Sequence, residues 1–410
     1  MHGKEDLVNF YQSLRCVPLL SLPTPPESSP MTRFPLTLCA LFSFATASLF
    51  AADTPKPQAL GSDLPHFELP GTDGKTYTPQ SFKDSQLLCI VFTCNHCPTA
   101  QRYEERLKEL TSEYAPQGVA VIAINPNNAD AVRLDEMSWT DVGDTLEDMK
   151  IRAAHKAFNF VYLDDGPTQE ISRVFGPVAT PHVFIYDEER KLRFQGRIDD
   201  AELPQYIKTH DTRAALDALL AGNQPEVATT RVFGCSVKWA EKAEGYNKIW
   251  AQSLKEEPVS VELVDADALR ALRENKDSGK IRVINLWATW CGPCVVEFPD
   301  LVDLNVTFRN RDFELVTVAA EYPNMEAKVL KFLEGKHASM RNVMFGNTDK
   351  YAMIEAIDPE WSGALPHTLV VNEKGVVIYR HTGPLDFIEL RRQLLPALES
   401  ITPWGGLDGN

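Results

Sequence analysis

The sequence predicts an α/β protein with two similar domains, each built on a central mixed sheet flanked by helices. Two observations lead to this fold class. First, short apolar runs typical of buried strands alternate along the chain with charged amphipathic stretches of helical length. Second, the chain repeats one order of motifs: an apolar run, a Cys-x-x-Cys motif, a long insertion, a Pro-His pair and a strand–turn–strand segment. This repeat indicates two domains of one architecture.

The first 52 residues predict a non-native leader followed by a signal peptide. A short basic start at 31–33 precedes an apolar stretch at 36–50, and Ala51-Ala52 offers small residues for cleavage. Because signal peptides begin at the chain start, we expect Met31 to be the initiator and residues 1–30 to lie upstream of it. An uncleaved anchor and a disordered leader are the alternatives. Cleavage predicts export to the periplasm or cell envelope, where disulfides persist.

The first domain is predicted over residues 58–222. It opens with a hairpin whose turn, residues 71–74, is rich in Gly and Asp. The apolar run 87–92 predicts the next strand, and the charged stretch after it predicts a helix at 97–114. The same patterns predict a strand at 119–124, a helix ending near 158, strands at 179–186 and 192–198, and a helix at 213–220.

The second domain is predicted over residues 256–402. A polar linker at 223–255 precedes it and carries the tail motif Gly-Cys-Ser-Val-Lys-Trp at 234–239. The apolar run 281–288 predicts the first strand, which leads directly into the second Cys-x-x-Cys motif. The later patterns predict a helix to about 309, a strand at 313–318, a helix at 326–333, strands at 364–371 and 376–379, and a helix at 385–398.

The composition limits the possible partners. A hydrophobic content of 44% and a charged content of 24% are those of a globular protein, and 410 residues suffice for two domains. The net charge of −16 argues against nucleic acid or an anionic membrane surface as a partner. The body of the chain contains no apolar stretch as long as a transmembrane helix. We therefore expect a protein that is not embedded in a membrane once the signal is cleaved.

Cys291 and Cys294 indicate redox chemistry. Two cysteines three residues apart at a strand-to-helix corner can close a small disulfide ring. The N-terminus of a helix favours negative charge and so stabilises the thiolate of the first cysteine. Such a pair is a site for thiol–disulfide exchange. The alternative, structural zinc, requires a second pair of ligands nearby, which the sequence of this domain lacks.

Cys94 and Cys97 form the other Cys-x-x-Cys motif, and His96 lies between them. A dithiol site is again the main prediction. A structural disulfide is one alternative. A metal site made by Cys94, His96 and Cys97 is another, because this soft ligand set suits zinc or copper. A cationic imidazole near the first sulfur would favour its thiolate and make the pair more oxidising.

The second domain resembles the exported thioredoxin-like reductases of the TlpA and cytochrome-c-maturation type. The resemblance rests on residues 285–294, the Glu-Phe-Pro segment at 297–299 and Leu365-Pro366. It implies that Cys291 is the attacking thiolate and Cys294 the resolving thiol. It also implies that Pro366 is a cis-proline facing the disulfide, which leaves the preceding backbone free to pair with a substrate chain.

The same resemblance points to Glu297. Thioredoxins have a buried Asp where this chain has Asn285, so protons at the cysteine pair must be handled differently here. Glu297 matches an acidic residue that the family places near the pair, and it is the candidate replacement.

The first domain resembles the AhpC/TSA (redoxin, peroxiredoxin-like) proteins of the thioredoxin fold. The motifs are residues 92–98, Thr180-Pro181, residues 196–200 and the tail at 234–239. The resemblance implies that Pro181 is the cis-proline of this domain and that the tail belongs to it. Peroxiredoxins place a Thr three residues before the peroxidatic Cys, whereas Thr93 lies four before Cys97. The family name suggests antioxidant activity, but the residues indicate dithiol chemistry.

Together these motifs predict an exported thiol–disulfide oxidoreductase that acts on protein thiols and disulfides, needs no cofactor, and receives electrons from a membrane or periplasmic donor. The Gly-Pro dipeptide of the second pair is that of thioredoxin, whose potential is low. The two pairs could therefore differ by roughly 90–150 mV, and electrons would pass from Cys291/Cys294 to Cys94/Cys97. The alternatives are a thiol-dependent peroxidase and a copper-binding chaperone with a thioredoxin partner domain.

Overall fold

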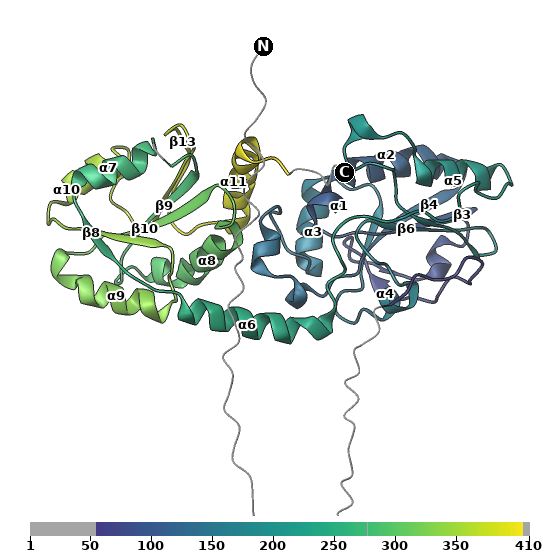
Figure 1. The fold of residues 1–410 in the computed structure, drawn as a ribbon, viewed down its shortest axis with the longest axis horizontal. Coiled ribbons are helices and arrows are strands. Elements are labelled where there is room, and N and C mark those ends of the chain that lie inside the picture. The colour runs from purple at the N-terminus through teal and green to yellow at the C-terminus, as the bar shows by residue number, and fades with distance from the viewer. Residues whose placement is uncertain (1–54, 277, 405–410) are drawn as a thin grey trace, which may run out of the picture. The chain divides into compact units, whose positions relative to one another are not determined.

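The computed structural model describes residues 55–276 and 278–404, and it contains two large sheets (Figure 1). The predicted leader and signal peptide lie outside the described residues. One sheet has five strands in the order β5-β4-β3-β6-β7, and the other has six in the order β13-β12-β9-β10-β11-β8. Both sheets are mixed and flanked by helices, so the predicted fold class is confirmed.

The five-stranded sheet is centred on β3 (Leu87–Phe92), which is parallel to β4 and antiparallel to β6. The other elements of this part of the chain are β1 (Leu69–Pro70), β2 (Thr76–Tyr77), α1 (Pro98–Arg102), α2 (Glu104–Tyr114), β4 (Val119–Asn125), α3 (Leu146–His155), β5 (Val161–Asp164), α4 (Glu170–Phe175), β6 (His182–Tyr186), β7 (Leu192–Gly196) and α5 (Asp211–Leu220).

All six residues of β3 are buried, because helices cover both faces of the sheet. Leu87, Cys89 and Val91 pack on one face with side chains of α2, α3 and α5. Leu88 and Ile90 pack on the other face with Phe175 of α4. The continuous apolar run in the sequence is therefore the signature of a central strand.

The six-stranded sheet is centred on β9 (Ile281–Trp287), which lies between parallel β10 and antiparallel β12. The other elements are β8 (Glu262–Val264), α7 (Ala266–Glu274), α8 (Gly292–Phe308), β10 (Phe313–Ala319), α9 (Glu326–Gly335), β11 (Arg341–Phe345), α10 (Lys350–Ile357), β12 (His367–Val371), β13 (Val377–Thr382) and α11 (Phe387–Ile401). Residues of α8, α9 and α11 cover one face, and residues of α7 and α10 cover the other.

Several predicted elements differ from the observed ones. The single helix expected at 97–114 is two helices that meet at Tyr103, whose backbone N–H bonds to the carbonyl of Ala100, three residues back. The strand expected at 179–186 begins at His182. The sequence patterns also missed β5, α4, β8, β11 and α10, which are short, and α7, although its apolar residues recur at helical spacing.

The segment after α5 returns to the first sheet before the second domain begins. Thr229 forms a bridge with Gln195 of β7, and Cys235 forms one with Thr180. The backbone N–H of Lys238 donates to the side chain of Asn127. The tail motif at 234–239 therefore packs against the first domain, as the resemblance predicts, and α6 (Ala243–Glu256) follows it.

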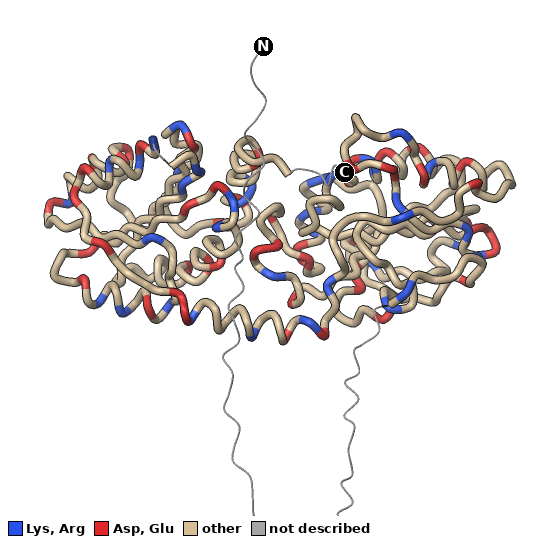
Figure 2. Tube along the Cα trace, in the orientation of Figure 1, with Lys and Arg blue, Asp and Glu red and all other residues tan. Residues whose placement is uncertain are grey.

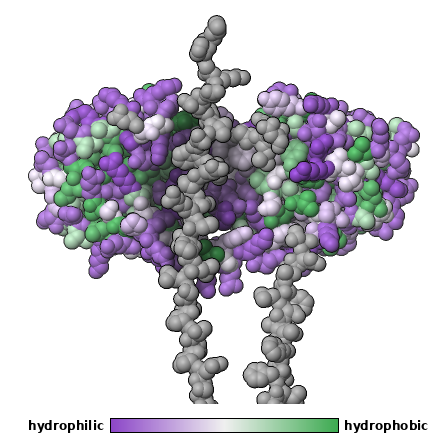
Figure 3. All heavy atoms as spheres, viewed as in Figure 1, coloured by the Kyte–Doolittle hydropathy of each residue, from purple (hydrophilic) through white to green (hydrophobic). Residues whose placement is uncertain are grey.

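Acidic and basic residues are interspersed along the chain (Figure 2), and hydrophilic residues cover much of the face seen in Figure 3. Among the described residues, no helix combines the length and the apolar character that crossing a membrane requires.

Candidate active sites

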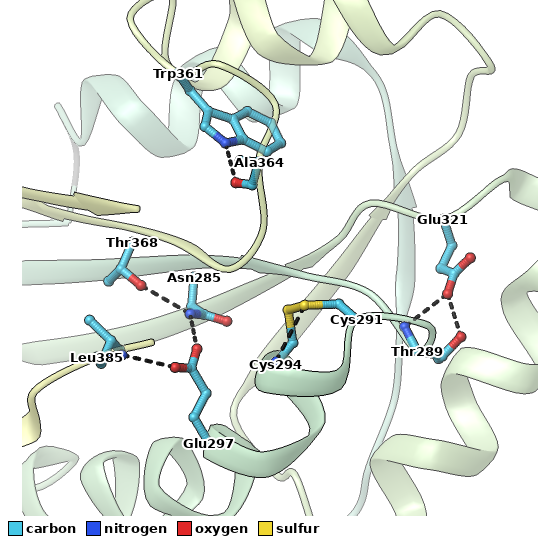
Figure 4. The surroundings of a disulfide bond; sticks show 10 residues. All are labelled: Asn285, Thr289, Cys291, Cys294, Glu297, Glu321, Trp361, Ala364, Thr368 and Leu385. Atoms are coloured by element: carbon cyan, nitrogen blue, oxygen red, sulfur yellow. Dashed lines mark hydrogen bonds between the residues drawn. A yellow bond between two sulfur atoms is a disulfide. The ribbon is translucent and has the colours of Figure 1, made fainter. Parts of the chain in front are cut away.

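The second-domain site is a disulfide between Cys291 and Cys294 at the start of α8 (Figure 4). Strand β9 ends four residues before Cys291, which is the N-cap of the helix, and Pro293 lies in its first turn. The backbone N–H of Cys294 points at the Cys291 sulfur, 3.3 Å away. Cys291 is 6% exposed and Cys294 is fully buried, so an incoming sulfur meets Cys291 first.

Pro366 follows a cis peptide bond, as the resemblance predicts. The segment before it is held by Trp361, whose ring N–H donates to the carbonyl of Ala364 at 2.7 Å (Figure 4). Within the described part of the chain, the backbone N–H of Leu365 has no hydrogen-bond partner. This edge can therefore pair with the backbone of another chain. Trp290, next to the reactive cysteine, is 62% exposed and offers an apolar contact to such a chain.

Glu297 lies one turn after Cys294 on α8, and its side chain points toward Asn285 of β9 (Figure 4). One carboxylate oxygen accepts from the Asn285 amide at 3.4 Å, and the other accepts from the backbone N–H of Leu385 at 3.0 Å. Burial raises the pKa of Glu297 above its ordinary value. A buried carboxyl with a raised pKa in this position can take up and return a proton during exchange at the disulfide.

Glu321 also belongs to this site, although no motif in the sequence indicates it. It accepts hydrogen bonds from both the backbone N–H and the hydroxyl of Thr289, two residues before Cys291 (Figure 4). These bonds hold the loop that positions the reactive cysteine.

The first-domain site contains three cysteines rather than two. Cys94, Cys97 and Cys235 are free thiols that pack together, the first two with 3% and 0% exposure. The Cys94 sulfur lies 3.2 Å from the hydroxyl of Thr180, and the Cys97 sulfur lies 3.5 Å from the carbonyl oxygen of the same residue. From its sequence context Cys235 could pair, bind a metal or pack beside Trp239, and the fold brings it to this site.

The two Cys-x-x-Cys motifs occupy different positions relative to their helices. Cys97 is the N-cap of α1 and accepts the N–H of Ala100 at 3.4 Å, just as Cys291 accepts that of Cys294. Ala100 thus takes the place of the resolving cysteine, and Cys94 precedes the helix. The expectation that the first sulfur carries the thiolate is therefore wrong for the first domain.

The pKa shifts of the three cysteines also favour a thiolate at Cys97. Burial alone would raise the pKa of Cys97, but hydrogen bonds from Cys235 and Cys94, together with the charge of His96, lower it well below its usual range. Burial raises the pKa of Cys94. The hydrogen bond to Cys97, with burial, raises that of Cys235. These pKa shifts favour a thiolate at Cys97 over one at Cys94 or Cys235.

His96 owes its charge to Asp144, which the sequence did not single out. Nδ1 of His96 lies 2.6 Å from the Asp144 carboxylate, and both side chains are fully buried. Burial opposes the charge on the imidazole, but the neighbouring carboxylate outweighs this effect and raises the pKa of His96. The pair places a buried positive charge beside Cys97.

Cys94, His96 and Asp144 have ligand atoms within 4.8 Å of one another, so they are the group here that could hold a metal ion. The sequence-based set had Cys97 in place of Asp144. The Asp144 carboxylate already accepts four hydrogen bonds, from His96 Nδ1, the Asn127 amide and the backbone N–H groups of Asn95 and His96. Because these donors use its lone pairs, the Asp144 carboxylate has little capacity left to bind a metal ion.

Pro181 also follows a cis peptide bond, and here the preceding residue is paired. The backbone N–H of Thr180 donates to the carbonyl of Cys235 at 2.9 Å. In the first domain, the tail thus takes the backbone hydrogen bond that Leu365 leaves available in the described part of the second domain.

The chain matches two family models of known proteins. A family model described as the AhpC/TSA family matches residues 60–195, and one described as Redoxin matches residues 260–394. The chain carries an AhpC/TSA domain and a redoxin domain in tandem. The predicted pair of domain types is thereby confirmed.

The chain is also similar to curated proteins. The thiol:disulfide interchange protein CycY of Rhizobium leguminosarum is 29% identical over 138 residues, which are 32% of this chain and 65% of CycY. The thiol-disulfide oxidoreductase ResA of Halalkalibacterium halodurans is 30% identical over 118 residues, 27% of this chain and 62% of ResA. The chain thus spans slightly less than two thirds of each relative.

Among solved structures, a hypothetical protein from Sinorhizobium meliloti 1021 shares 34% sequence identity with this chain, with a TM-score of 0.40. The match covers 45% of this chain and 97% of the Sinorhizobium chain. A structure of an uncharacterized conserved protein from Geobacillus kaustophilus shares 33%, with the same TM-score, over 44% of this chain and 92% of its own.

Proposed function

We propose that this chain is a thiol–disulfide oxidoreductase whose second domain exchanges disulfides with proteins through Cys291 and Cys294. The observation that carries the proposal is the disulfide at the N-terminus of α8, together with a backbone N–H at Leu365 that has no partner among residues 55–276 and 278–404. The names of CycY and ResA, a thiol:disulfide interchange protein and a thiol-disulfide oxidoreductase, support it.

The reaction proceeds in two exchange steps. In the reduced protein, the Cys291 thiolate attacks a substrate disulfide, which forms a mixed disulfide and releases the other substrate sulfur as a thiolate. Cys294 then loses its proton toward Glu297 and attacks the Cys291 sulfur. The second substrate sulfur leaves and takes up a proton. The substrate gains two electrons, and the two cysteines lose them as their disulfide forms.

We further propose that electrons pass from Cys291/Cys294 to the first-domain cysteines. The buried charge of His96 supports this direction because it stabilises the Cys97 thiolate, and stabilising the reduced form makes a site more oxidising. The position of Cys94, where peroxiredoxins have a Thr, does not favour a peroxidase. The saturated carboxylate of Asp144 does not favour a copper site.

Export is part of the proposal. The basic, apolar and small-residue order at 31–52 supports a cleaved signal and a periplasmic or envelope location, where protein thiols and a membrane or periplasmic electron donor would be the partners. The mass of the mature chain isolated from its host tests this point, because cleavage near Ala52 predicts loss of the whole leader.

Reduction of insulin disulfides by the full chain, with dithiothreitol as electron source, tests the catalytic proposal. We expect Cys291→Ser to lower the rate to that of dithiothreitol alone. We expect Cys294→Ser to accumulate a mixed disulfide with insulin, because the resolving thiol is gone. Cys89→Ala is the matched control, since Cys89 is buried in the first sheet away from both sites. A Cys291→Ser chain that reduces insulin at the wild-type rate contradicts the proposal.

A further inference from the structure

We propose that Cys235 is the third redox-active thiol of the first-domain site and forms a disulfide with Cys97, as a substrate cysteine held within the same chain. The inference rests on the thiol chemistry proposed for the first domain. It does not depend on exchange at Cys291, which can be measured separately.

The first step of the argument is the contact between sulfurs. Cys94 and Cys97 are buried in one cluster and Cys235 packs against it, so two potential resolving thiols lie beside one nucleophile. Ala100 stands where the resolving cysteine of the second domain would be. A disulfide partner for Cys97 must therefore come from outside the helix, and Cys235 is already in contact with it.

The second step is the backbone. Cys235 lies antiparallel to Thr180, the residue before the cis-proline, and its carbonyl accepts the Thr180 N–H at 2.9 Å. The equivalent residue in the second domain, Leu365, leaves its N–H free among the described residues. The tail thus makes the backbone contact that we propose for a protein substrate in the second domain, with its own cysteine beside the nucleophile.

The third step is the fit of the tail. A Cβ atom on Gly234 would lie 2.1 Å from the carbonyl oxygen of Thr180, and the φ angle of this glycine is +137°. Only glycine allows the backbone to approach so closely here. Further along, Lys238 pairs with Asn127 and Asn128, and Trp239 is 4% exposed. These contacts fix the tail on both sides of Cys235.

The proposed steps balance when a substrate disulfide is the oxidant. The Cys97 thiolate attacks a substrate disulfide, forms a mixed disulfide and releases one substrate thiolate. Cys235 loses its proton and attacks the Cys97 sulfur, so the Cys97–Cys235 bond forms and the second substrate thiolate leaves and is protonated. The substrate gains two electrons and the two cysteines lose two. Cys94 can then attack Cys97, which forms Cys94–Cys97 and frees Cys235 without net oxidation.

Peptide mapping distinguishes the two possible disulfides. Trypsin cleaves after Lys83, Arg102, Arg231 and Lys238, so Cys94 and Cys97 share the peptide 84–102, whereas Cys235 lies in 232–238. A Cys94–Cys97 bond stays within one peptide, but a Cys97–Cys235 bond joins two. The Cys89→Ala substitution leaves only Cys94 and Cys97 in the larger peptide. The full chain with this substitution is oxidised with glutathione disulfide, alkylated and digested.

We expect the joined peptide in this chain and a larger yield of it when Cys94→Ala is added. We expect none with Cys235→Ser. If the Cys94→Ala chain instead carries glutathione on Cys97 and an alkylated Cys235, the proposal is wrong.

A second variant, Cys94→Ser, covers a Cys94→Ala chain that fails to fold. Because the disulfide cannot move to residue 94 in this variant, brief oxidation must protect Cys235 from N-ethylmaleimide, and an unprotected Cys235 overturns the proposal. Insulin reduction is assayed on the same preparations, so a failure at Cys291 is scored separately from a failure at Cys235.

Discussion

At the scale of residues, the two Cys-x-x-Cys motifs differ in which sulfur sits at the helix N-terminus. Cys291 is the first cysteine of its motif and Cys97 is the second, yet both are N-caps that accept the amide N–H three residues on. An N-cap sulfur receives hydrogen bonds and the field of the helix, which favour a thiolate. The reactive atom is therefore set by the turn into the helix, and not by the order of cysteines in the motif.

His96→Asn is expected to raise the pKa of Cys97, because it removes the buried positive charge but keeps a side chain that can bond to Asp144. Although burial opposes it, Asp144 raises the pKa of His96, so the wild-type imidazole keeps its proton to a higher pH than an ordinary histidine does. The pH dependence of thiolate absorbance, in a chain with Cys291→Ser and Cys294→Ser, measures the change. His155→Asn, an exposed substitution, is the control. Identical titrations in both variants contradict the role of His96.

Glu297→Gln is expected to slow exchange at Cys291 and Cys294 by about 100-fold, the usual contribution of a positioned acid or base. The pKa of Glu297 is raised, so in the wild-type protein the rate should fall as the pH drops through that raised value and the carboxylate becomes protonated. The variant should lose this dependence. Insulin reduction followed against pH is the measurement, with Glu334→Gln on the exposed surface of α9 as control. A variant that keeps the wild-type pH profile excludes Glu297 as the proton acceptor.

Sequence reasoning identified the cysteines, both cis-prolines and Glu297, because motif spacing and family resemblance carry that information. It did not find Asp144, which lies 48 residues from His96 and has no local signal. It also left Cys235 unassigned, since only the fold shows that the tail returns to Thr180. Contacts between residues far apart in the chain explain both omissions.

At the scale of elements, the strands at the centre of each sheet were the easiest to predict. β3 and β9 are uniformly apolar because helices cover both of their faces. Short elements at the sheet edges were missed: β5 has four residues and β8 has three. In such short segments a period of two or of 3.6 cannot be recognised, and packing rather than local pattern decides their structure.

The placement of the tail motif at 234–239 depends on Gly234. Gly234→Ala would put a methyl group against the carbonyl of Thr180 at a positive φ angle, a strain on the order of 1–3 kcal/mol. We expect the tail to detach more often, Cys97 to be alkylated faster by N-ethylmaleimide, and the Cys97–Cys235 disulfide to form in lower yield.

Gly245→Ala in α6 is the matched control for this prediction, because nothing lies within 4 Å of its added Cβ atom. Should both variants show the wild-type alkylation rate at Cys97, the tail does not cover the nucleophile.

At the scale of the whole molecule, the chain combines an open and a closed thiol site. Among the residues that the structure describes, the backbone N–H before the cis-proline has no partner in the second domain, whereas in the first domain it pairs with Cys235. This difference suits an arrangement in which the second domain binds external proteins and the first domain receives electrons from it.

The reduction potentials of the two sites test that division. In full chains that retain only one set of cysteines, we expect the first-domain site to have the higher potential by roughly 90–150 mV. Equilibration with glutathione mixtures, followed by alkylation and mass spectrometry, gives both values. Equal potentials would remove the driving force for electron transfer from Cys291/Cys294.

The number of cysteines at the first site has one more consequence. Cys94, Cys97 and Cys235 pack in a single cluster, and a disulfide takes two of them at a time. However the site is oxidised, an odd sulfur remains, and it lies next to the bond it could attack. Formation of one disulfide within the cluster therefore leaves one of the three thiols reduced. The bond can move among neighbouring sulfurs without any electron leaving the protein, so the first domain can store an oxidising equivalent and still keep a nucleophile ready.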